Sequence, residues 1–228
     1  MLRRPTRAER IGLSISLATG LYGVSFGALA VASGLTFWQA MALSLLMFTG
    51  GSQFAFIGVV GAGGSGTAAF GAATLLGVRN AVYGMQVNRL LGPRGWGRLA
   101  AAQLTIDEST AAATGQREPD EQRRGFWTTG VGVFVAWNLF TAIGAVAGDL
   151  LGDPRRWGLD GAAVAAFLAL MWPRLRGREP IALAVACALV TVVALPLVPA
   201  GVPILFAAAV AAAWALLLRA PPRQGGAD

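Results

Sequence analysis

The chain of 228 residues is 55% hydrophobic and 13% charged, whereas a soluble domain carries roughly 25% charged residues. This composition argues against a soluble protein and predicts an all-α, polytopic helical membrane protein. The net charge is +7 and every basic residue is arginine. The arginines cluster between apolar runs, as in cytoplasmic loops, so nucleic acid is not expected as a partner. The chain has no histidine and one cysteine, which excludes histidine-based catalysis and an intrachain disulfide.

A single transmembrane domain is expected to cover residues 1–220, followed by a short disordered tail at 221–228. Its apolar segments are expected at about 11–33, 37–62, 67–91, 99–114, 126–151, 159–172, 181–198 and 202–218. The segment at 99–114 is too short and too polar for an ordinary span, so seven or eight crossings of the lipid bilayer are expected. The first segment is too long for a signal-peptide core and is expected to be retained.

Arginine placement predicts the orientation of the chain. The N-terminus and the loops at 116–124 and 173–180 are the most basic short segments, so all three are expected in the cytoplasm. With eight crossings the C-terminus would also be cytoplasmic. The loop at 152–158 would then lie outside, and its two arginines make it a mild misfit.

Glycine spacing predicts a close helix crossing. Gly23 and Gly27 in the first segment, and Gly144 and Gly148 in the fifth, have the small-xxx-small spacing that lets helices approach closely. The stretch from Gly23 to Gly27 also matches the G-x-S-x-G pattern of hydrolases, but it lies mid-helix in a chain without histidine. No catalytic residue, cofactor or metal site is expected, and the protein is not expected to be an enzyme.

The segment at 37–62 is interrupted near its middle by the sequence Thr49-Gly50-Gly51-Ser52-Gln53. Two adjacent glycines with hydroxyl and amide neighbours weaken a helix at that point. Two interpretations remain open. The stretch is either a broken helix whose exposed backbone groups contact a substrate or a close-packed, glycine-rich crossing.

Arg79 lies near the centre of the segment at 67–91, and Asn80 and Tyr83 follow it. An arginine at the bilayer midplane costs at least about 2.5–3.5 kcal/mol on insertion scales. It therefore needs a functional or pairing role, unless a break at Gly77 lets it reach the membrane surface.

The short segment at 99–114 carries two adjacent carboxylates, Asp107 and Glu108. This segment is a half-helix, a re-entrant segment or an interfacial helix. Neighbouring residues point to different faces of a helix, so the two carboxylates do not form an acid–base couple. Either one is suited to pair with Arg79 or to carry a proton. The alternative is an acidic helix start at the level of the lipid headgroups.

Several of these residues together resemble a known family. The pattern consists of Gly23, Phe26 and Gly27, then Ser44 and Phe48 to Phe54, then Arg79, Asn80 and Tyr83, then Asp107 and Glu108, then Trp137, Thr141 and Gly144, then Gly158 to Asp160. In this order and spacing it resembles the AzlC family, the large subunit of bacterial branched-chain amino acid exporters, over about residues 12–220. The family usually has Phe-Ala-Gly at Phe48-Thr49-Gly50, and often a proline at Leu21-Tyr22. These departures bear on the substrate more than on the fold.

The resemblance implies a multi-pass secondary exporter in the bacterial plasma membrane. Its expected substrates are the small hydrophobic amino acids leucine, isoleucine and valine, with methionine as a further candidate, and its expected driving force is the proton-motive force. The resemblance also implies a small membrane subunit of the AzlD type. Whether the chain works alone, as a homo-oligomer or only with that subunit stays open. The alternatives are a channel or transporter for another small solute, or a non-transporting membrane scaffold.

A zwitterionic substrate with an apolar side chain needs three kinds of contact. Arg79 or the backbone at Gly50 and Gly51 would hold its carboxylate, and Asp107 or Glu108, or carbonyls at the break, would hold its ammonium. Aromatic residues would form the apolar pocket, with Phe48, Phe54, Tyr83 and Trp137 as candidates. The predicted substrate-binding residues are Gly50, Gly51, Ser52, Gln53, Arg79, Asn80, Tyr83 and Trp137. The predicted proton-coupling residues are Asp107 and Glu108.

Overall fold

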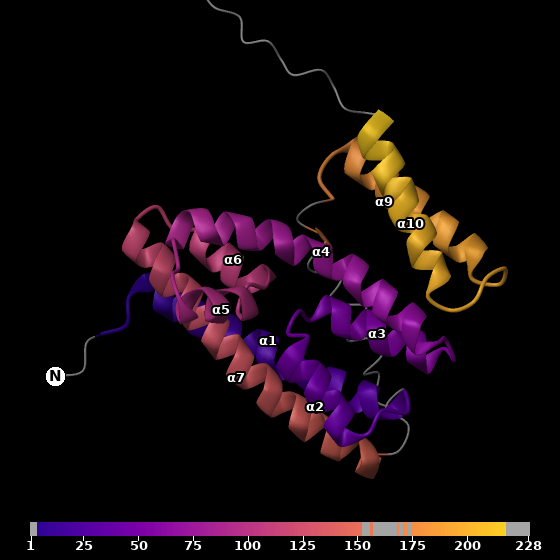
Figure 1. Ribbon diagram of the computed structural model, residues 1–228, viewed down its shortest axis with the longest axis horizontal. Coiled ribbons are helices and arrows are strands. Elements are labelled where there is room, and N and C mark those ends of the chain that lie inside the picture. The colour runs from indigo at the N-terminus through magenta and orange to yellow at the C-terminus, as the bar shows by residue number, and fades with distance from the viewer. Residues whose placement is uncertain (1–3, 152–155, 157–167, 169–170, 173–174, 218–228) are drawn as a thin grey trace, which may run out of the picture.

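The computed structural model of the chain describes residues 4–151, 156, 168, 171–172 and 175–217. The helices are α1 (Arg7–Ala32), α2 (Phe37–Leu46), α3 (Gly51–Gly61), α4 (Gly66–Leu91), α5 (Trp96–Gln103), α6 (Asp107–Thr114), α7 (Pro119–Leu151), α9 (Arg178–Ala194) and α10 (Val202–Leu217) (Figure 1). No strand occurs among these residues, which agrees with the predicted all-α class. Most of the predicted segment at 159–172, the motif at 158–160 and the tail at 221–228 lie outside the described residues.

Local sequence signals set where the helices begin and end. Thr6 begins α1 with a capping box, in which its hydroxyl accepts a hydrogen bond from the Glu9 amide at 3.4 Å and the Glu9 carboxylate accepts one from the Thr6 amide at 2.7 Å. Thr36 and Gln39 begin α2 in the same way. The helix α4 ends at Gly92, whose φ of +54° favours glycine. Hydroxyl residues and glycines therefore mark these boundaries in the sequence.

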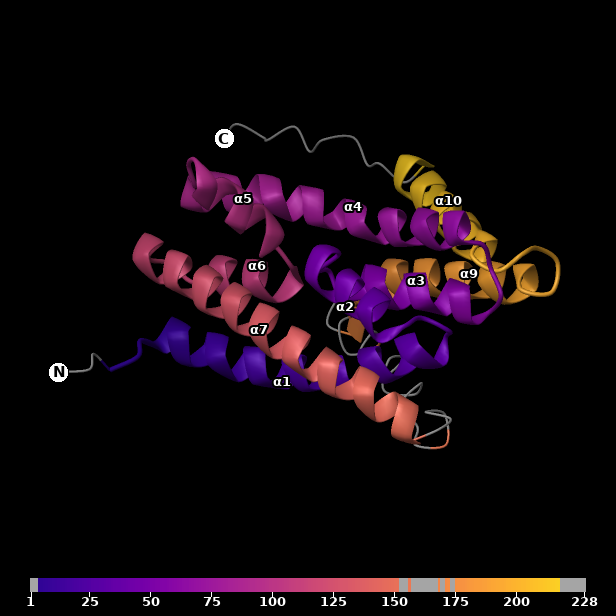
Figure 2. The same ribbon diagram turned by 60° about the horizontal axis from the view of Figure 1, so that its bottom comes forward.

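The helices α1 and α7 run side by side in the same direction and form the frame of the fold (Figure 2). Their contact uses the glycines predicted for a close crossing. A Cβ atom added at Gly23 would lie 2.8 Å from the Trp137 carbonyl oxygen, and one added at Gly148 would lie 3.2 Å from the Ala28 Cα atom. The helix α1 and the Pro119–Gly148 part of α7 are the two described helices that are long and apolar enough to cross a membrane.

The predicted segment at 37–62 forms two short helices, α2 and α3, that meet at a break. The chain leaves α1 at Ser33 and enters α2 at Phe37. The end of α3 then lies next to Ser33 again. A Cβ atom added at Gly61 would lie 2.8 Å from the Ser33 hydroxyl. The pair α2–α3 is therefore a hairpin and not one continuous helix, which agrees with a predicted fold that has at least one broken or re-entrant helix.

The predicted segment at 99–114 forms a second hairpin, α5–α6, at the other end of the fold. The helix α5 begins shortly after the end of α4, and α6 ends shortly before α7. Arg123 of α7 donates a hydrogen bond to the Leu91 carbonyl at the end of α4, at 3.2 Å. The tips of the two hairpins meet, because the Gln103 side chain at the end of α5 donates to the Leu45 carbonyl of α2 at 2.8 Å.

The order of elements from α1 to α7 is therefore long helix, hairpin, long helix, hairpin, long helix. The helices α1 and α4 both have 26 residues, and the two hairpins occupy opposite halves of the fold (Figure 2). Such an inverted arrangement is common in transporters. Within residues 7–151, three helices run the full length of the fold where the sequence suggested four or five crossings.

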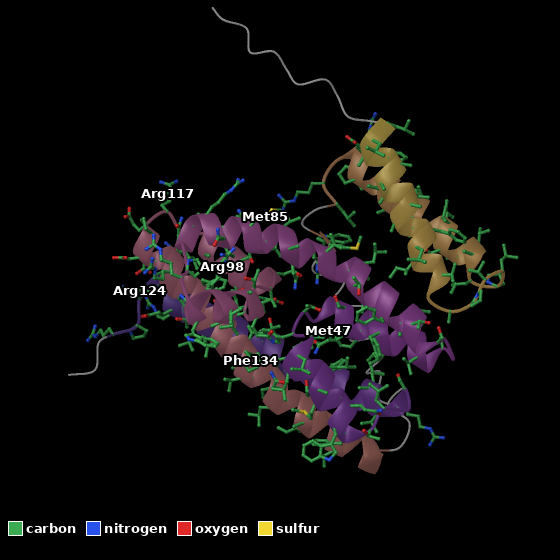
Figure 3. The ribbon with its side chains drawn as sticks, viewed as in Figure 1. Met47, Met85, Arg98, Arg117, Arg124 and Phe134 are labelled. Carbon is green, nitrogen blue, oxygen red and sulfur yellow. The ribbon has the colours of Figure 1, made fainter. Side chains whose placement is uncertain are left out.

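The basic segments share one end of this bundle. The Ala8 amide of α1 donates to the Glu121 carboxylate of α7 at 3.4 Å, so the N-terminus and the 116–124 loop are neighbours, as expected. Arg98, Arg117 and Arg124 lie at the same end (Figure 3). We call this the basic end. The predicted segments at 181–198 and 202–218 form the hairpin α9–α10, whose connecting loop lies at the opposite end. A Cβ atom added at Gly64 would lie 3.0 Å from the Ala200 carbonyl oxygen.

The hairpin path predicts the outcome of side-specific labelling. In a Cys187→Ser background, Trp38→Cys and Ala62→Cys should both react with a membrane-impermeant maleimide added on one side of the membrane, because both positions are exposed at the end opposite the basic end. Arg117→Cys should react from the other side. Labelling of positions 38 and 62 from opposite sides would contradict the hairpin.

Candidate functional site

The tips of the two hairpins enclose a cavity of about 390 Å³. Five parts of the chain line it: α1, the α2–α3 break, α4, the α5–α6 break and α7. The lining residues are Ala18, Thr19, Tyr22, Phe48, Thr49, Gly50, Gly51, Phe54, Arg79, Ile106, Asp107, Glu108, Val133 and Trp137. A size of a few hundred cubic ångströms and a mixture of apolar and polar walls are typical of small-molecule sites.

The first break requires glycine and is held by one side chain. Gly50 has φ +61° and ψ −79°, a conformation that residues with a Cβ atom rarely adopt. Gln53 is completely buried. Its carbonyl oxygen accepts from the Gly50 amide at 3.1 Å and its amide donates to the Leu43 carbonyl at 3.0 Å. Gln53 thus satisfies the Gly50 amide and ties it to the Leu43 carbonyl of the first half-helix, which stabilises the broken geometry.

The second break is held in the same way by Ser109. This residue is completely buried. Its hydroxyl accepts from the Ile106 amide at 3.1 Å and donates to the Leu104 carbonyl at 2.6 Å. Gln53 and Ser109 occupy the same position, the third residue of the second half-helix. The two breaks are therefore built on one plan with different side chains.

Arg79 connects the two breaks. Its Nη1 atom forms an ion pair with the Asp107 Oδ2 atom at 2.8 Å, and its Nη2 atom donates to the Thr49 carbonyl at 3.4 Å. The side chains of Arg79 and Asp107 are 29% and 13% exposed. Of the readings that the sequence left open, the structure shows the pairing role for Arg79, and α4 continues through Gly77 without a break.

Asp107 and Glu108 begin α6, and both line the cavity. A carboxylate in the first turn of a helix is stabilised by the positive end of the helix dipole. Among the described residues Asp107 forms an ion pair with Arg79, whereas none is found for Glu108. Successive helix residues differ in direction by about 100°, so the two carboxylates reach the cavity from different angles.

An aromatic cluster forms the apolar wall of the cavity. The ring of Tyr22 lies 5.1 Å from that of Phe54 and 5.9 Å from that of Trp137, measured between centroids. Phe26 packs behind them, 5.5 Å from Phe54 and 6.0 Å from Trp137. Sequence reasoning missed Tyr22 as a site residue. Its position between Gly20 and Gly23, which contact α7, was the available signal.

The predicted site residues fall into two groups. Those that line the cavity are Gly50, Gly51, Arg79, Trp137, Asp107 and Glu108. Ser52, Gln53, Asn80 and Tyr83 are not among its lining residues. Of the predicted apolar pocket, Phe48, Phe54 and Trp137 line the cavity and Tyr83 does not. The lining residues Ala18, Thr19, Tyr22, Thr49, Ile106 and Val133 were not predicted.

Several polar atoms of the lining residues are buried without a hydrogen-bond partner among the described residues. They are Tyr22 Oη, Thr49 Oγ1, Arg79 Nε, Asp107 Oδ1 and Trp137 Nε1. Buried polar groups in proteins are nearly always hydrogen-bonded. Five of the eleven such atoms among the described residues thus belong to residues that line this cavity, where water or a polar ligand can bond them.

Comparison with known proteins identifies the family. Residues 14–151 match the family model described as AzlC protein, and this range covers more than half of the chain. The chain belongs to the AzlC family. This family is associated with subunits of branched-chain amino acid exporters, and the protein is accordingly a helical membrane protein of a transport family. The match contains both hairpins and the cavity, whereas α9 and α10 lie beyond it. No curated protein and no solved structure matches the chain.

The role of Gln53 predicts a stability loss. Gln53→Leu keeps the size but leaves the Gly50 amide unpaired, at roughly 1–3 kcal/mol, while the Leu43 carbonyl keeps its bond from the Met47 amide at 2.9 Å. Gln39→Leu is the matched control, because Gln39 caps α2 where its groups are exposed to solvent. Denaturation in detergent micelles should show a clearly larger loss for Gln53→Leu. Equal losses would contradict the assigned role.

Proposed function

We propose that this AzlC-family protein is the large subunit of a secondary exporter of branched-chain amino acids in the bacterial plasma membrane. Its substrates would be leucine, isoleucine and valine, with methionine as a further substrate, and the N-terminus would lie in the cytoplasm. The observation that carries the proposal is the cavity itself. It places a guanidinium, two carboxylates and an aromatic wall at the meeting point of two helix breaks.

These groups match the parts of an amino acid. The substrate carboxylate would bind Arg79 and the amides at the start of α3, where a helix N-terminus favours an anion. Asp107 would hold the ammonium group. The branched side chain would lie against Phe48, Phe54 and Trp137, which all line the cavity. A scaffold without transport activity would not need a charged pair at this depth, because such groups are costly in a membrane.

Glu108 is the better candidate for proton coupling. Asp107 is engaged with Arg79, whereas among the described residues Glu108 lines the cavity without an ion pair. We infer that Glu108 binds a proton when the cavity opens to the side rich in protons and releases it on the other side. In this scheme proton entry accompanies amino acid exit.

A small AzlD-type subunit is proposed as the partner. The support is the family membership, because AzlC proteins typically pair with AzlD proteins. The outer face of α1 offers an apolar surface to a membrane neighbour, since Leu13, Leu17 and Leu21 are all more than half exposed. Their spacing of four residues places them on one side of the helix.

Efflux measurements test the substrate proposal. Cells that express the chain, alone and with a candidate small subunit, are loaded with leucine- or isoleucine-containing dipeptides, and the free amino acid outside is followed. Arg79→Gln should lower efflux at least about tenfold, because it removes the proposed partner of the substrate carboxylate and leaves the mostly buried Asp107 without its ion pair. Arg124→Gln, which breaks the partly exposed ion pair with Glu121 away from the cavity, should leave efflux unchanged. Normal efflux by the Arg79→Gln variant, at normal protein levels, would contradict the proposed role of Arg79 in substrate binding.

Proteoliposomes separate proton coupling from substrate binding. Glu108→Gln should abolish leucine movement driven by a pH gradient but retain leucine–leucine exchange, because only the proton-carrying group is lost. Glu118→Gln is the control, since Glu118 is exposed in the 116–124 loop. Gradient-driven transport that survives in Glu108→Gln would assign the proton to another group.

A further inference from the structure

The Arg79–Asp107 ion pair uses only part of the bonding capacity of its two partners. One nitrogen of Arg79 contacts one oxygen of Asp107, at 2.8 Å. Arg79 Nε and Asp107 Oδ1 are both buried and have no hydrogen-bond partner among the described residues. Both residues line the cavity. A pair built only for stability would be expected to satisfy these atoms, since a half-satisfied buried pair is worse than an apolar contact.

We propose that this ion pair is the selectivity element of the site and that a zwitterion binds by exchanging with it. The ligand carboxylate takes the place of Asp107 on Arg79, and the ligand ammonium takes the place of Arg79 on Asp107. Two ion pairs then replace one, and no charge is left alone. This inference rests on the proposed function, since it assumes that the cavity is the substrate site.

The exchange explains how ligands with one charge are rejected. A carboxylate without an ammonium can pair with Arg79 only by leaving Asp107 buried and alone, and an amine without a carboxylate leaves Arg79 alone. An unpaired buried charge is strongly unfavourable. The ion pair thus disfavours ligands with one charge and favours a zwitterion.

The two residues that take part in the exchange contact the tips of both hairpins. Arg79 also holds the Thr49 carbonyl at the tip of α2–α3, whereas Asp107 begins α6 at the tip of α5–α6. A bound zwitterion therefore joins the two tips through its own two charges. A ligand with one charge can form an ion pair with only one of these two residues.

The test compares matched ligands by equilibrium titration of the full chain, with its small subunit where that is needed, in lipid nanodiscs. The ligands are leucine, 2-hydroxy-4-methylpentanoate, in which a hydroxyl replaces the ammonium, and leucinol, in which a hydroxymethyl replaces the carboxylate. The same sets are made for alanine and phenylalanine. The variants are Asp107→Asn, Arg79→Gln, the double variant and Glu121→Gln, the last of which breaks the other described ion pair.

The wild-type protein should bind leucine at least about tenfold more tightly than either analogue, because each analogue leaves one buried charge unpaired. Asp107→Asn should shift the leucine-to-hydroxy-acid preference at least about tenfold toward the hydroxy acid, and Arg79→Gln should shift preference toward leucinol in the same way. Glu121→Gln should keep the wild-type preference. The double variant restores neutrality, so it should fold and bind all three ligands weakly.

Two results would overturn the inference. One is equal binding of leucine and its hydroxy acid by the wild-type protein. The other is an Asp107→Asn variant that binds all ligands less tightly with an unchanged preference, which would make Asp107 purely structural. If only the alanine or phenylalanine set shows the switch, the exchange holds and the branched-chain proposal fails. If the folded wild-type protein binds none of the zwitterions, both fail.

Discussion

The charge of Arg79 in the middle of α4 is the constraint on which the rest of the fold depends. A guanidinium at this depth must be surrounded by acceptors, and an intact helix offers none, because its carbonyls are already bonded within it. The two helix breaks supply them. One break exposes the Thr49 carbonyl, and the other begins a helix whose first residue is Asp107. The arginine and the two interruptions are therefore parts of a single arrangement.

Breaking two helices leaves backbone groups that must be satisfied without water. Gln53 and Ser109 do this at equivalent positions, and each bonds one group on either side of its break. The close α1–α7 contact provides the rigid frame against which the tips lie. Small residues make that contact possible, and the same two helices carry Tyr22 and Trp137 to the cavity. The frame and the aromatic wall are thus two faces of one helix pair.

Much of this arrangement could be predicted from sequence, and the failures share a cause. Gly50-Gly51 and Arg79 indicated a break and a buried pair because each violates a strong rule for membrane helices. The path of the chain could not be read in the same way. The length of an apolar segment indicates how many residues avoid water. It does not indicate whether the chain continues across the bilayer or turns back to the side from which it came. Residues 37–62 therefore suggested one crossing, whereas the structure has a hairpin. The sequence indicated that either Asp107 or Glu108 could pair with Arg79. Only the structure shows that Asp107 forms the ion pair.

The same limit applies to Gln53 and Tyr22, whose hydrogen bonding is visible only in the structure. A polar residue at a break suggests ligand contact, yet both ends of the Gln53 side chain are bonded to the backbone within the fold. Tyr22 is not among the predicted site residues, yet its hydroxyl is buried at the cavity without a partner among the described residues. Hydrogen bonding distinguishes the two side chains that hold the breaks from the polar side chains that line the cavity. Gln53 and Ser109 are satisfied and hold the breaks open, whereas Arg79, Asp107, Tyr22 and Trp137 each keep an unsatisfied atom at the cavity. Such a distinction depends on partners far apart in the chain, so it belongs to the structure and cannot be assigned from residue type alone.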